Sequence, residues 1–277
     1  MLRIDLHSHS TCSDGTESPE AVAARAADRA VAIFALTDHD TCAGTGLPVT
    51  NARSLRAVEL SCSDDTGRTV HILAYDRGGT GPGGGDWAVL EHRLAAVRVA
   101  RVNRMRVMAA RLEQRGIRID VTPLLAAADL RSIGRPDLAR AMVAAGAATS
   151  IKDAFARHLY DGGPVDVPHR NLSLDEAIAL GRDIGAALSL AHPHLYDDRS
   201  AGILDRYRGR GLTGIEAFHG AYDARERSRW LALADRLALT CTGGSDWHGP
   251  DDALAPMGVD LPDDRGDALL RWLDRPS

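Results

Sequence analysis

Two histidines two residues apart, His7 and His9, are the first residues in the chain whose types and spacing suit metal binding. They follow residues 2–6, a short apolar segment with the composition of a β-strand. Alternate side chains of an extended segment point the same way, so both rings can converge on one point, where neutral imidazoles bind metal ions. An isolated pair of this kind more often consists of two turn residues. The hypothesis of a metal site therefore depends on further ligands elsewhere in the chain.

Further carboxylates and imidazoles occur at or just after other predicted strands. Each one alone has an ordinary structural explanation, such as a turn, a helix cap, an ion pair or a buried histidine. Separate explanations for all of them, at the same end of different strands, are improbable. Together with the first pair they form a candidate metal centre of nine residues: His7, His9, Asp14, His39, Glu59, His71, His192, Asp246 and His248.

Nine ligands are too many for one ion, because a catalytic zinc keeps only three or four. The mixed imidazole and carboxylate set predicts two or three divalent ions, with Mn²⁺ favoured and Zn²⁺ or Fe²⁺ as alternatives. Neighbouring ions of this kind lower the pKa of a bridging water and hold the oxygens of an in-line displacement. The set therefore predicts hydrolysis of a phosphoester, or less directly of an amide, by a metal-bridging hydroxide. No side chain is predicted to be the nucleophile.

The elements that would position these residues alternate between strand-like and helix-like segments. The predicted helices are residues 19–29, 174–183 and 223–236, and the predicted strands are 2–6, 32–37, 57–60, 69–74, 186–191, 213–217 and 239–242. This alternation is typical of parallel strands joined by helices, in an α/β barrel or an open sheet. If the strands are parallel, their carboxyl ends face one mouth, and the candidate ligands gather there.

The middle of the chain has a different pattern. Residues 77–86 are rich in glycine and are expected to be a flexible connection, because they lack the Lys-Ser/Thr ending of a phosphate loop. From residue 87 to about 158 the pattern is helical, beginning with a long helix that Gly116 is expected to stop. We therefore expect residues 101–166 to form a helical insertion that covers the active-site mouth, and residues 1–100 and 167–277 to form the barrel.

Length and composition narrow the classes of protein. A chain of 277 residues fits one large domain or one domain with a sizeable insertion. The net charge of −5 and the pI of about 6.1 argue against a generally basic surface for nucleic acid or membrane. No apolar run is long enough to span a bilayer and no signal-peptide pattern is present, so we expect a cytoplasmic protein. The scattered cysteines predict neither a disulfide framework nor a zinc ribbon.

The motifs around the nine candidates resemble those of the PHP (polymerase and histidinol phosphatase) phosphoesterases, in the same order and over essentially the whole chain. They are His7-Ser8-His9, Ser13-Asp14-Gly15, Thr37-Asp38-His39-Asp40, Glu59-Leu60-Ser61, Ala191-His192-Pro193 and Gly244-Ser245-Asp246-Trp247-His248. The resemblance implies a distorted (β/α)7 barrel with a trinuclear metal centre. It further implies one ion held by His7, His9, Glu59 and Asp246, a second by Glu59, His71 and His192, and a third by Asp14, His39 and His248.

The helical insertion and residues 134–140 resemble one branch of that family, which includes nucleoside 3′,5′-bisphosphate phosphatases and the exoribonuclease called ribonuclease AM. The resemblance makes Arg135 the best candidate for binding a substrate phosphate, since a guanidinium can bind phosphate bidentately. Arg140 and His194 are weaker candidates. The branch usually has histidine at Asp137, a fourth candidate substrate contact, and an aromatic residue at Asp166. These changes leave the substrate open, although they do not touch the predicted ligands.

Three functions are compatible with these residues. The leading hypothesis is a metal-dependent phosphatase for a small molecule, with an AMP-like nucleotide or a 3′,5′-bisphosphate favoured. An alternative keeps the metal centre but acts on a non-nucleotide intermediate, such as a sugar or amino-alcohol phosphate. A remote alternative is a non-catalytic metal-binding regulatory module, which the complete ligand set disfavours. Because aromatic residues make up only 4% of the chain, we expect no nucleic-acid binding beyond the end of a short oligonucleotide.

Overall fold

One mixed β-sheet forms the centre of the computed structural model, which describes the chain apart from residues 78–85, 130, 169–170, 252–254 and 276–277. Its strands lie in the order β8-β7-β6-β4-β3-β2-β1-β9, and β5 pairs with β3. Their bounds are β1 Leu2–Asp5, β2 Ile33–Leu36, β3 Arg53–Ser63, β4 Thr69–Tyr75, β5 Leu172–Ser173, β6 Ala187–Leu190, β7 Leu212–His219, β8 Thr240–Gly244 and β9 Val259–Leu261. The predicted Gly-rich connection lies largely outside the described residues.

The sheet nearly closes on itself, because the chain after β1 approaches β8. The N–H of Leu6 donates a hydrogen bond of 3.0 Å to the carbonyl of Gly243. A Cβ atom on Gly244 would lie 2.5 Å from the backbone nitrogen of His7, so this close approach requires glycine. The expected α/β barrel is therefore confirmed, and the ends of β1 and β8 become neighbours.

The direction of β4 corrects the expectation that all strands are parallel. β4 runs antiparallel to both β3 and β6, while the pairs β1–β2, β2–β3, β6–β7 and β7–β8 are parallel. The turn between β3 and β4 is short and is held by Asp64, whose carboxylate accepts from the N–H groups of Thr66 and Arg68. Such a short connection can join only antiparallel strands. His71 lies near the start of β4, opposite Ser61 near the end of β3, so it still faces the expected end of the barrel.

Five helices cover the outside of the barrel: α1 Pro19–Asp28, α6 Leu174–Asp183, α7 Arg199–Tyr207, α8 Ala224–Leu237 and α9 Asp263–Leu273. Side chains cap the N-termini of several of these helices. Ser173 caps α6 in a capping box with Glu176, and Asp223 caps α8. The three predicted helices are thus confirmed. Residues 37–52, all of which are described, contain turns rather than a helix.

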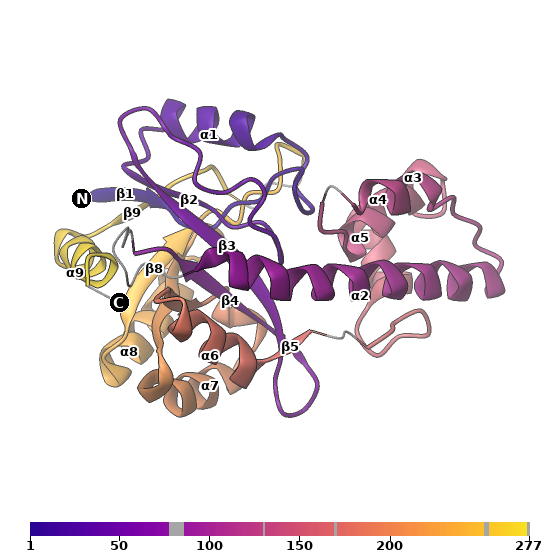
Figure 1. The fold of residues 1–277 in the computed structure, drawn as a ribbon. Helices are drawn as coiled ribbons and strands as arrows, with labels where there is room; N and C mark the ends of the chain where they lie inside the picture. Colours follow the sequence, from indigo (N-terminus) through magenta and orange to yellow (C-terminus); the bar gives the residue numbers. More distant parts are fainter. Residues whose placement is uncertain (78–85, 130, 169–170, 252–254, 276–277) are drawn as a thin grey trace.

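The helical region extends away from the barrel along one long helix (Figure 1). It comprises α2 Trp87–Gln114, α3 Thr122–Ala127, α4 Arg135–Ala144, α5 Ile151–Ala154 and a π-helical turn at Phe155–Leu159. Gly116, with φ of +80°, lies just beyond the end of α2, as expected. The first half of α2 packs into the barrel core through Trp87, Leu90, Leu94 and Val97. Its second half belongs to a separate core through Met105, Met108 and Leu112.

Two further features concern the environment of the chain. Within the described residues, no helix combines the length and the apolar character needed to cross a membrane. The four cysteines, Cys12, Cys42, Cys62 and Cys241, are all free. Burial raises the pKa of the Cys62 thiol well above its usual value, so this side chain acts as an apolar packing group in the barrel core.

Candidate metal centre

The nine predicted ligands lie together at one end of the barrel, with Glu59 at their centre. Glu59 projects from β3, is 1% exposed, and has five imidazole nitrogens around its two carboxylate oxygens. The nitrogen-to-oxygen distances are 3.2 Å for His7 and His9, 3.1 Å for His39, and 3.0 Å for His71 and His192. A single carboxylate therefore joins imidazoles that come from four different segments of the chain.

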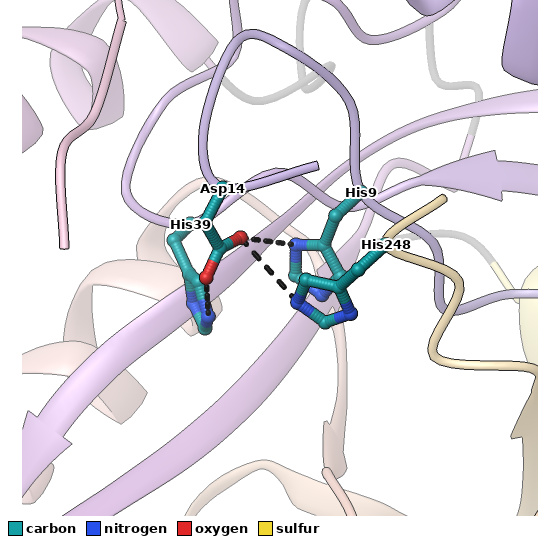
Figure 2. A group of neighbouring side chains, drawn as sticks. All are labelled: His9, Asp14, His39 and His248. Atoms are coloured by element: carbon teal, nitrogen blue, oxygen red, sulfur yellow. Dashed lines mark ion pairs between the residues drawn. The ribbon is translucent and has the colours of Figure 1, made fainter. Parts of the chain in front are cut away.

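The remaining two carboxylates extend this arrangement in two directions. Figure 2 shows Asp14 facing three imidazoles, with nitrogen-to-oxygen distances of 3.4 Å to His248, 3.6 Å to His9 and 3.7 Å to His39. Asp246 follows β8, and its Oδ1 lies 3.3 Å from His9 Nε2. His9 is thus shared between the two carboxylates.

Four groups of these residues place one ligand atom each within 4.8 Å of all the others. They are His9, Asp14, His39 and His248, here called the insertion-side group; His7, Glu59 and His192, here called the barrel-side group; His7, His9 and Asp246; and His39, Glu59 and His71. The groups overlap at Glu59, as the family resemblance implied. They also differ from the implied sets, because His9 lies with Asp14, His39 and His248, the three residues that the resemblance assigned to the third ion.

Several atoms inside this cluster lack hydrogen-bond partners among the described residues. They are buried and face one another: His7 Nε2, His9 Nε2, His39 Nδ1 and Glu59 Oε2. Buried polar atoms are normally hydrogen-bonded, so a convergence of unpartnered atoms indicates that something else satisfies them. Ring nitrogens and carboxylate oxygens are the donors that Mn²⁺, Zn²⁺ and Fe²⁺ accept. The residues present therefore fit divalent metal ions.

Comparison with known proteins identifies the family, although no protein-family model matches the chain. The chain is 34% identical over 275 residues to a 3′,5′-nucleoside bisphosphate phosphatase from Chromobacterium violaceum, a match that covers 95% of this chain and 93% of the relative. The chain belongs to the PHP family of phosphoesterases. The resemblance recognised from the motifs is thereby confirmed, and the protein is a metal-dependent phosphoric ester hydrolase.

Two further relatives of this PHP chain agree with that assignment. A phosphoribosyl 1,2-cyclic phosphate 1,2-diphosphodiesterase from Eggerthella lenta is 32% identical over 280 residues, covering 93% of this chain and 98% of the relative. A solved structure from Bifidobacterium adolescentis, described as a metal-dependent phosphoesterase, has a TM-score of 0.78 at 31% identity. It covers 97% of this chain and 95% of its own. Relatives at this level of identity therefore carry names with different phosphorylated substrates.

Burial and mutual contact set the protonation of the PHP cluster. Burial alone would raise the pKa of Glu59, but the surrounding histidines hold it well below its usual range. Asp14 and Asp246 behave in the same way. Burial opposes protonation of His9, yet its contacts with Asp246 and Glu59 prevail and raise its pKa to about 10. Burial lowers the pKa of His39 to about 3. The carboxylates are therefore ionised, as metal ligands must be.

Glu216 on β7 supports the barrel-side group and was missed by the sequence analysis. It is fully buried, accepts a hydrogen bond of 3.0 Å from His7 Nδ1, and accepts another of 2.6 Å from the N–H of His192. The first bond leaves His7 Nε2 free to bind a metal. The second holds His192, whose φ of +25° is unusual for a residue other than glycine. The available signal was a glutamate within an apolar strand segment.

His219, at the end of β7, was missed as well. Its Nε2 lies 3.5 Å from Asp246 Oδ2, and it is fully buried. Tyr196 adds a third supporting contact, because its hydroxyl accepts from the N–H of His71 and lies 3.1 Å from His192 Nδ1. Residues of the barrel and its loops therefore orient this part of the centre.

The insertion-side group is supported instead by arginines of the helical region. Arg101, on α2, donates two hydrogen bonds of 2.8 and 2.5 Å to the carboxylate of Asp40, the neighbour of His39. It donates a third, of 2.7 Å, to Ser61 Oγ on β3. Asp40 has a φ of +50°, so this ion pair holds a strained turn beside a predicted ligand.

Arg131 and Arg140 reach the loop that carries Asp14. Arg140 donates a hydrogen bond of 2.6 Å to the carbonyl of Asp14, and Arg131 donates to the carbonyl of Ser13. Asp137 joins them, because its Oδ1 accepts from Arg131 at 2.7 Å and lies 3.6 Å from Arg140. The other Asp137 oxygen accepts from the N–H of Gly134 at the start of α4. Burial raises the pKa of Asp137, and the two guanidinium groups neutralise its charge.

The four predicted substrate contacts thus have different surroundings. Asp137 and Arg140 belong to the contacts with the Asp14 loop. His194 is partly exposed, and its Nδ1 lies 2.9 Å from the hydroxyl of Tyr222. Arg135 pairs with Asp161 and donates to the carbonyl of Leu159 within the helical region. None of these contacts tests a substrate role.

Asp166, where the family resemblance led us to expect an aromatic residue, has a structural role. Asp166 accepts a hydrogen bond of 2.9 Å from Arg104, a buried residue of α2. Its carbonyl also accepts from Arg111. Burial lowers the pKa of Arg104 to about 10, against the opposing effect of Asp166. Asp166 therefore ties the end of the helical region to α2 rather than presenting a free carboxylate.

Proposed function

We propose that this PHP protein hydrolyses a phosphate ester of a small molecule, namely an AMP-like nucleotide or a nucleoside 3′,5′-bisphosphate. The observation that carries the proposal is the convergence of buried, unpartnered ring nitrogens on the carboxylate of Glu59. The relative named as a nucleoside bisphosphate phosphatase, at 34% identity, supports the choice of a nucleotide.

Three divalent ions, with Mn²⁺ preferred, would occupy this centre. The proposed ligands are His7, His9, Glu59 and Asp246 for one ion, Glu59, His71 and His192 for the second, and Asp14, His39 and His248 for the third. Such ions, when bound, lower the pKa of a water molecule and neutralise charge on the phosphoryl oxygens. The chain itself keeps the ring nitrogens correctly oriented, through Glu216 behind His7.

The helical insertion, residues 101–166, is proposed to cover the mouth of the site and to provide the substrate contacts Arg135, Asp137 and Arg140, while His194 contributes from the barrel. Arg140 is the best placed of the three insertion residues, because it already touches the Asp14 loop. The partner of Arg135, Asp161, has a side chain that is 86% exposed. An ion pair so exposed is worth only about 0–1 kcal/mol, so Arg135 can leave it for a phosphate.

Asp137 bears on the choice between nucleotide and non-nucleotide substrates. A free carboxylate at the mouth would repel a phosphate and favour a substrate with an amine. Here the carboxylate contacts Arg131 and Arg140 and caps α4, and its side chain is only 4% exposed. The arginines offset its charge, so Asp137 does not argue against a nucleotide.

A phosphate-release assay with purified protein and Mn²⁺ tests this function. The panel contains nucleoside monophosphates, nucleoside 3′,5′-bisphosphates, sugar phosphates and amino-alcohol phosphates. We expect the fastest release from a nucleotide. Fastest release from a sugar or amino-alcohol phosphate would select the non-nucleotide alternative. Metal binding without release from any member would leave only the regulatory module.

The substitution His192→Ala tests the assignment of the second ion. We expect turnover to be lost while the circular dichroism spectrum stays native, because the ring contacts Glu59 but fills no part of the apolar core. The matched control is His92→Ala, which removes an exposed histidine on α2. Retained activity in His192→Ala would contradict the assignment.

A further inference from the structure

Two of the loops that carry ligands of the insertion-side group, the loop of Asp14 and the loop of His39, contact residues of the helical region. Arg131, Arg140 and Ser132 contact the loop before and at Asp14: the arginines donate to the carbonyls of Ser13 and Asp14, and the N–H of Ser132 donates to the carbonyl of Cys12. Three successive carbonyls of the loop therefore accept from the helical insertion.

The second loop is held in a similar way. Arg101 pairs with Asp40, and its Nη1 group donates a hydrogen bond to the carbonyl of Ile133. Ile133 follows Ser132 directly in the chain. Arg98 adds a hydrogen bond of 2.9 Å to the carbonyl of Asp40. One arginine thus connects the residue after His39 to the segment that also contacts the Asp14 loop.

The barrel-side group has supporting contacts of a different origin. His7 and His192 are held by Glu216 from β7, and His192 also contacts Tyr196. Within the described residues, the hydrogen-bond partners of His7 and His192 all lie on barrel strands and their loops. Loss of a contact from the insertion should therefore affect the two groups unequally.

We infer that the helical insertion sets the metal affinity of the insertion-side group, with Arg101, Arg131 and Arg140 as positioning residues. This inference rests on the metal centre of the proposed function. The physical reason is that His39 and Asp14 belong to separate loops, and the distance of 3.7 Å between them is kept only if both loops are fixed. Within the barrel, Asp38 links the two loops by accepting hydrogen bonds from Ser10 and Ser13. The insertion adds a second set of contacts to both loops, which the ligands of the barrel-side group do not have.

Asp137 takes part in the same contacts between the insertion and the Asp14 loop. Its carboxylate contacts both arginines that hold the Asp14 loop, and it is fixed in turn by the N–H of Gly134 at the start of α4. A guanidinium held by an ion pair adopts fewer conformations. It therefore loses less conformational entropy when it donates a hydrogen bond to a loop carbonyl. The buried carboxylate of Asp137 therefore helps to hold the loop of Asp14 in position.

The test is the binding of Mn²⁺ alone, measured by stepwise calorimetric titration and by the metal content of dialysed protein. Substitutions of residues that support metal ligands cost about 10- to 100-fold in metal affinity. We expect a loss of this size for one ion in Arg140→Ala and Arg131→Ala, with the other ions unchanged. Arg140→Lys should recover part of the loss, since an ammonium can still donate to the carbonyl of Asp14.

The matched control is Arg157→Ala, which removes an arginine of the insertion that pairs with Asp153 one helical turn away. Its metal affinities should equal those of the unchanged chain. Native circular dichroism and thermal unfolding in every variant exclude loss of the fold as the cause. Because the readout is metal binding, the experiment is valid even if no phosphate ester is hydrolysed.

A double-mutant cycle identifies the affected group. His248 occurs only in the insertion-side group, so His248→Ala should remove the same ion that Arg140→Ala weakens. Arg140→Ala should then cause no further loss in the His248→Ala background, but its full loss in the His71→Ala background. Equal weakening of all ions, an unchanged affinity in both arginine variants, or a metal content insensitive to His248→Ala would each overturn the inference.

Discussion

The barrel-side group and the insertion-side group use the same ligand types but depend on different supports. A buried carboxylate of the barrel, Glu216, fixes the ring of His7. Arginines of the helical region fix the backbone of the loops that carry Asp14 and His39. The first support acts on a ligand's ring and fixes its tautomer, whereas the second acts on the shape of a loop. The supports of the barrel-side group therefore lie within the barrel, whereas the insertion-side group has supports both in the barrel, through Asp38, and in the helical region.

The two kinds of support should differ in how readily they change among related proteins. Glu216 is itself fully buried on β7, where a change of side chain would leave an unsatisfied polar group. The arginine contacts reach from α2, from α4 and from the segment before α4 to loops of the barrel, and loops change more readily than strands. Among PHP proteins with different substrates, we expect the insertion-side group to differ more than the barrel-side group.

The largest expected effect comes from Glu59, which joins both groups. Glu59→Ala removes a carboxylate in contact with five imidazoles. Metal ions supply several kcal/mol of transition-state stabilisation, so we expect kcat to fall by about 10³-fold or more. Phosphate release and Mn²⁺ content measure the loss, with Glu226→Ala on the outside of α8 as the control. A variant that keeps the ions of one group at full affinity would show that Glu59 does not bridge.

The second prediction isolates the barrel-side group. Glu216→Ala leaves His7 Nδ1 and the N–H of His192 without their acceptor, and we expect Mn²⁺ affinity to fall about 10- to 100-fold for the two ions assigned to His7 and His192. Glu216→Gln should lose less, because its amide oxygen can still accept from one donor. Calorimetric titration separates the two outcomes. If Glu216→Ala instead weakens the ion bound by Asp14 and His248, the two supports are not independent.

The third prediction concerns Asp137, which holds the arginines on the insertion side. Asp137→His removes the acceptor that caps α4, a change that costs about 0.5–2 kcal/mol in comparable caps. This corresponds to a fall in Tm of roughly 2–4 °C per kcal/mol for domains somewhat smaller than this one. Because the carboxylate is buried, we expect no gain in activity on nucleoside 3′,5′-bisphosphates. A gain, measured by phosphate release, would indicate that the native substrate differs from them.

The smallest expected effect comes from the exposed pair of Arg135 and Asp161. If Arg135 leaves this pair to bind a substrate phosphate, Asp161→Ala makes it available at no cost. An exposed pair is worth about 1 kcal/mol or less, so KM should fall by up to about fivefold with kcat unchanged. Asp153→Ala, which breaks the local pair with Arg157, is the control. An unchanged KM in Asp161→Ala would argue that Arg135 does not contact the substrate.

Much of the barrel could be predicted because local chemistry controls it. Apolar segments of four to eight residues predicted most of the strands, and the structure places caps at Ser18, Ser173 and Asp223, where the predicted helices begin. The direction of β4 was missed, because it depends on a short turn rather than on the strand's own residues. The side chain of Arg135 was also unpredictable, since its partners Asp161 and Leu159 lie more than twenty residues away.

The sequence by itself determined which residues are the candidate metal ligands. Few residue types bind divalent ions, so His7, His9 and Glu59 were recognisable from type and spacing alone. Only the tertiary structure decided which residues support them. Glu216 and Arg101 act through neighbours in space, and Arg101 is one of 33 lysine and arginine residues with nothing in the chain to single it out. A ligand is limited by the chemistry of the ion, whereas its support is limited only by distance and packing.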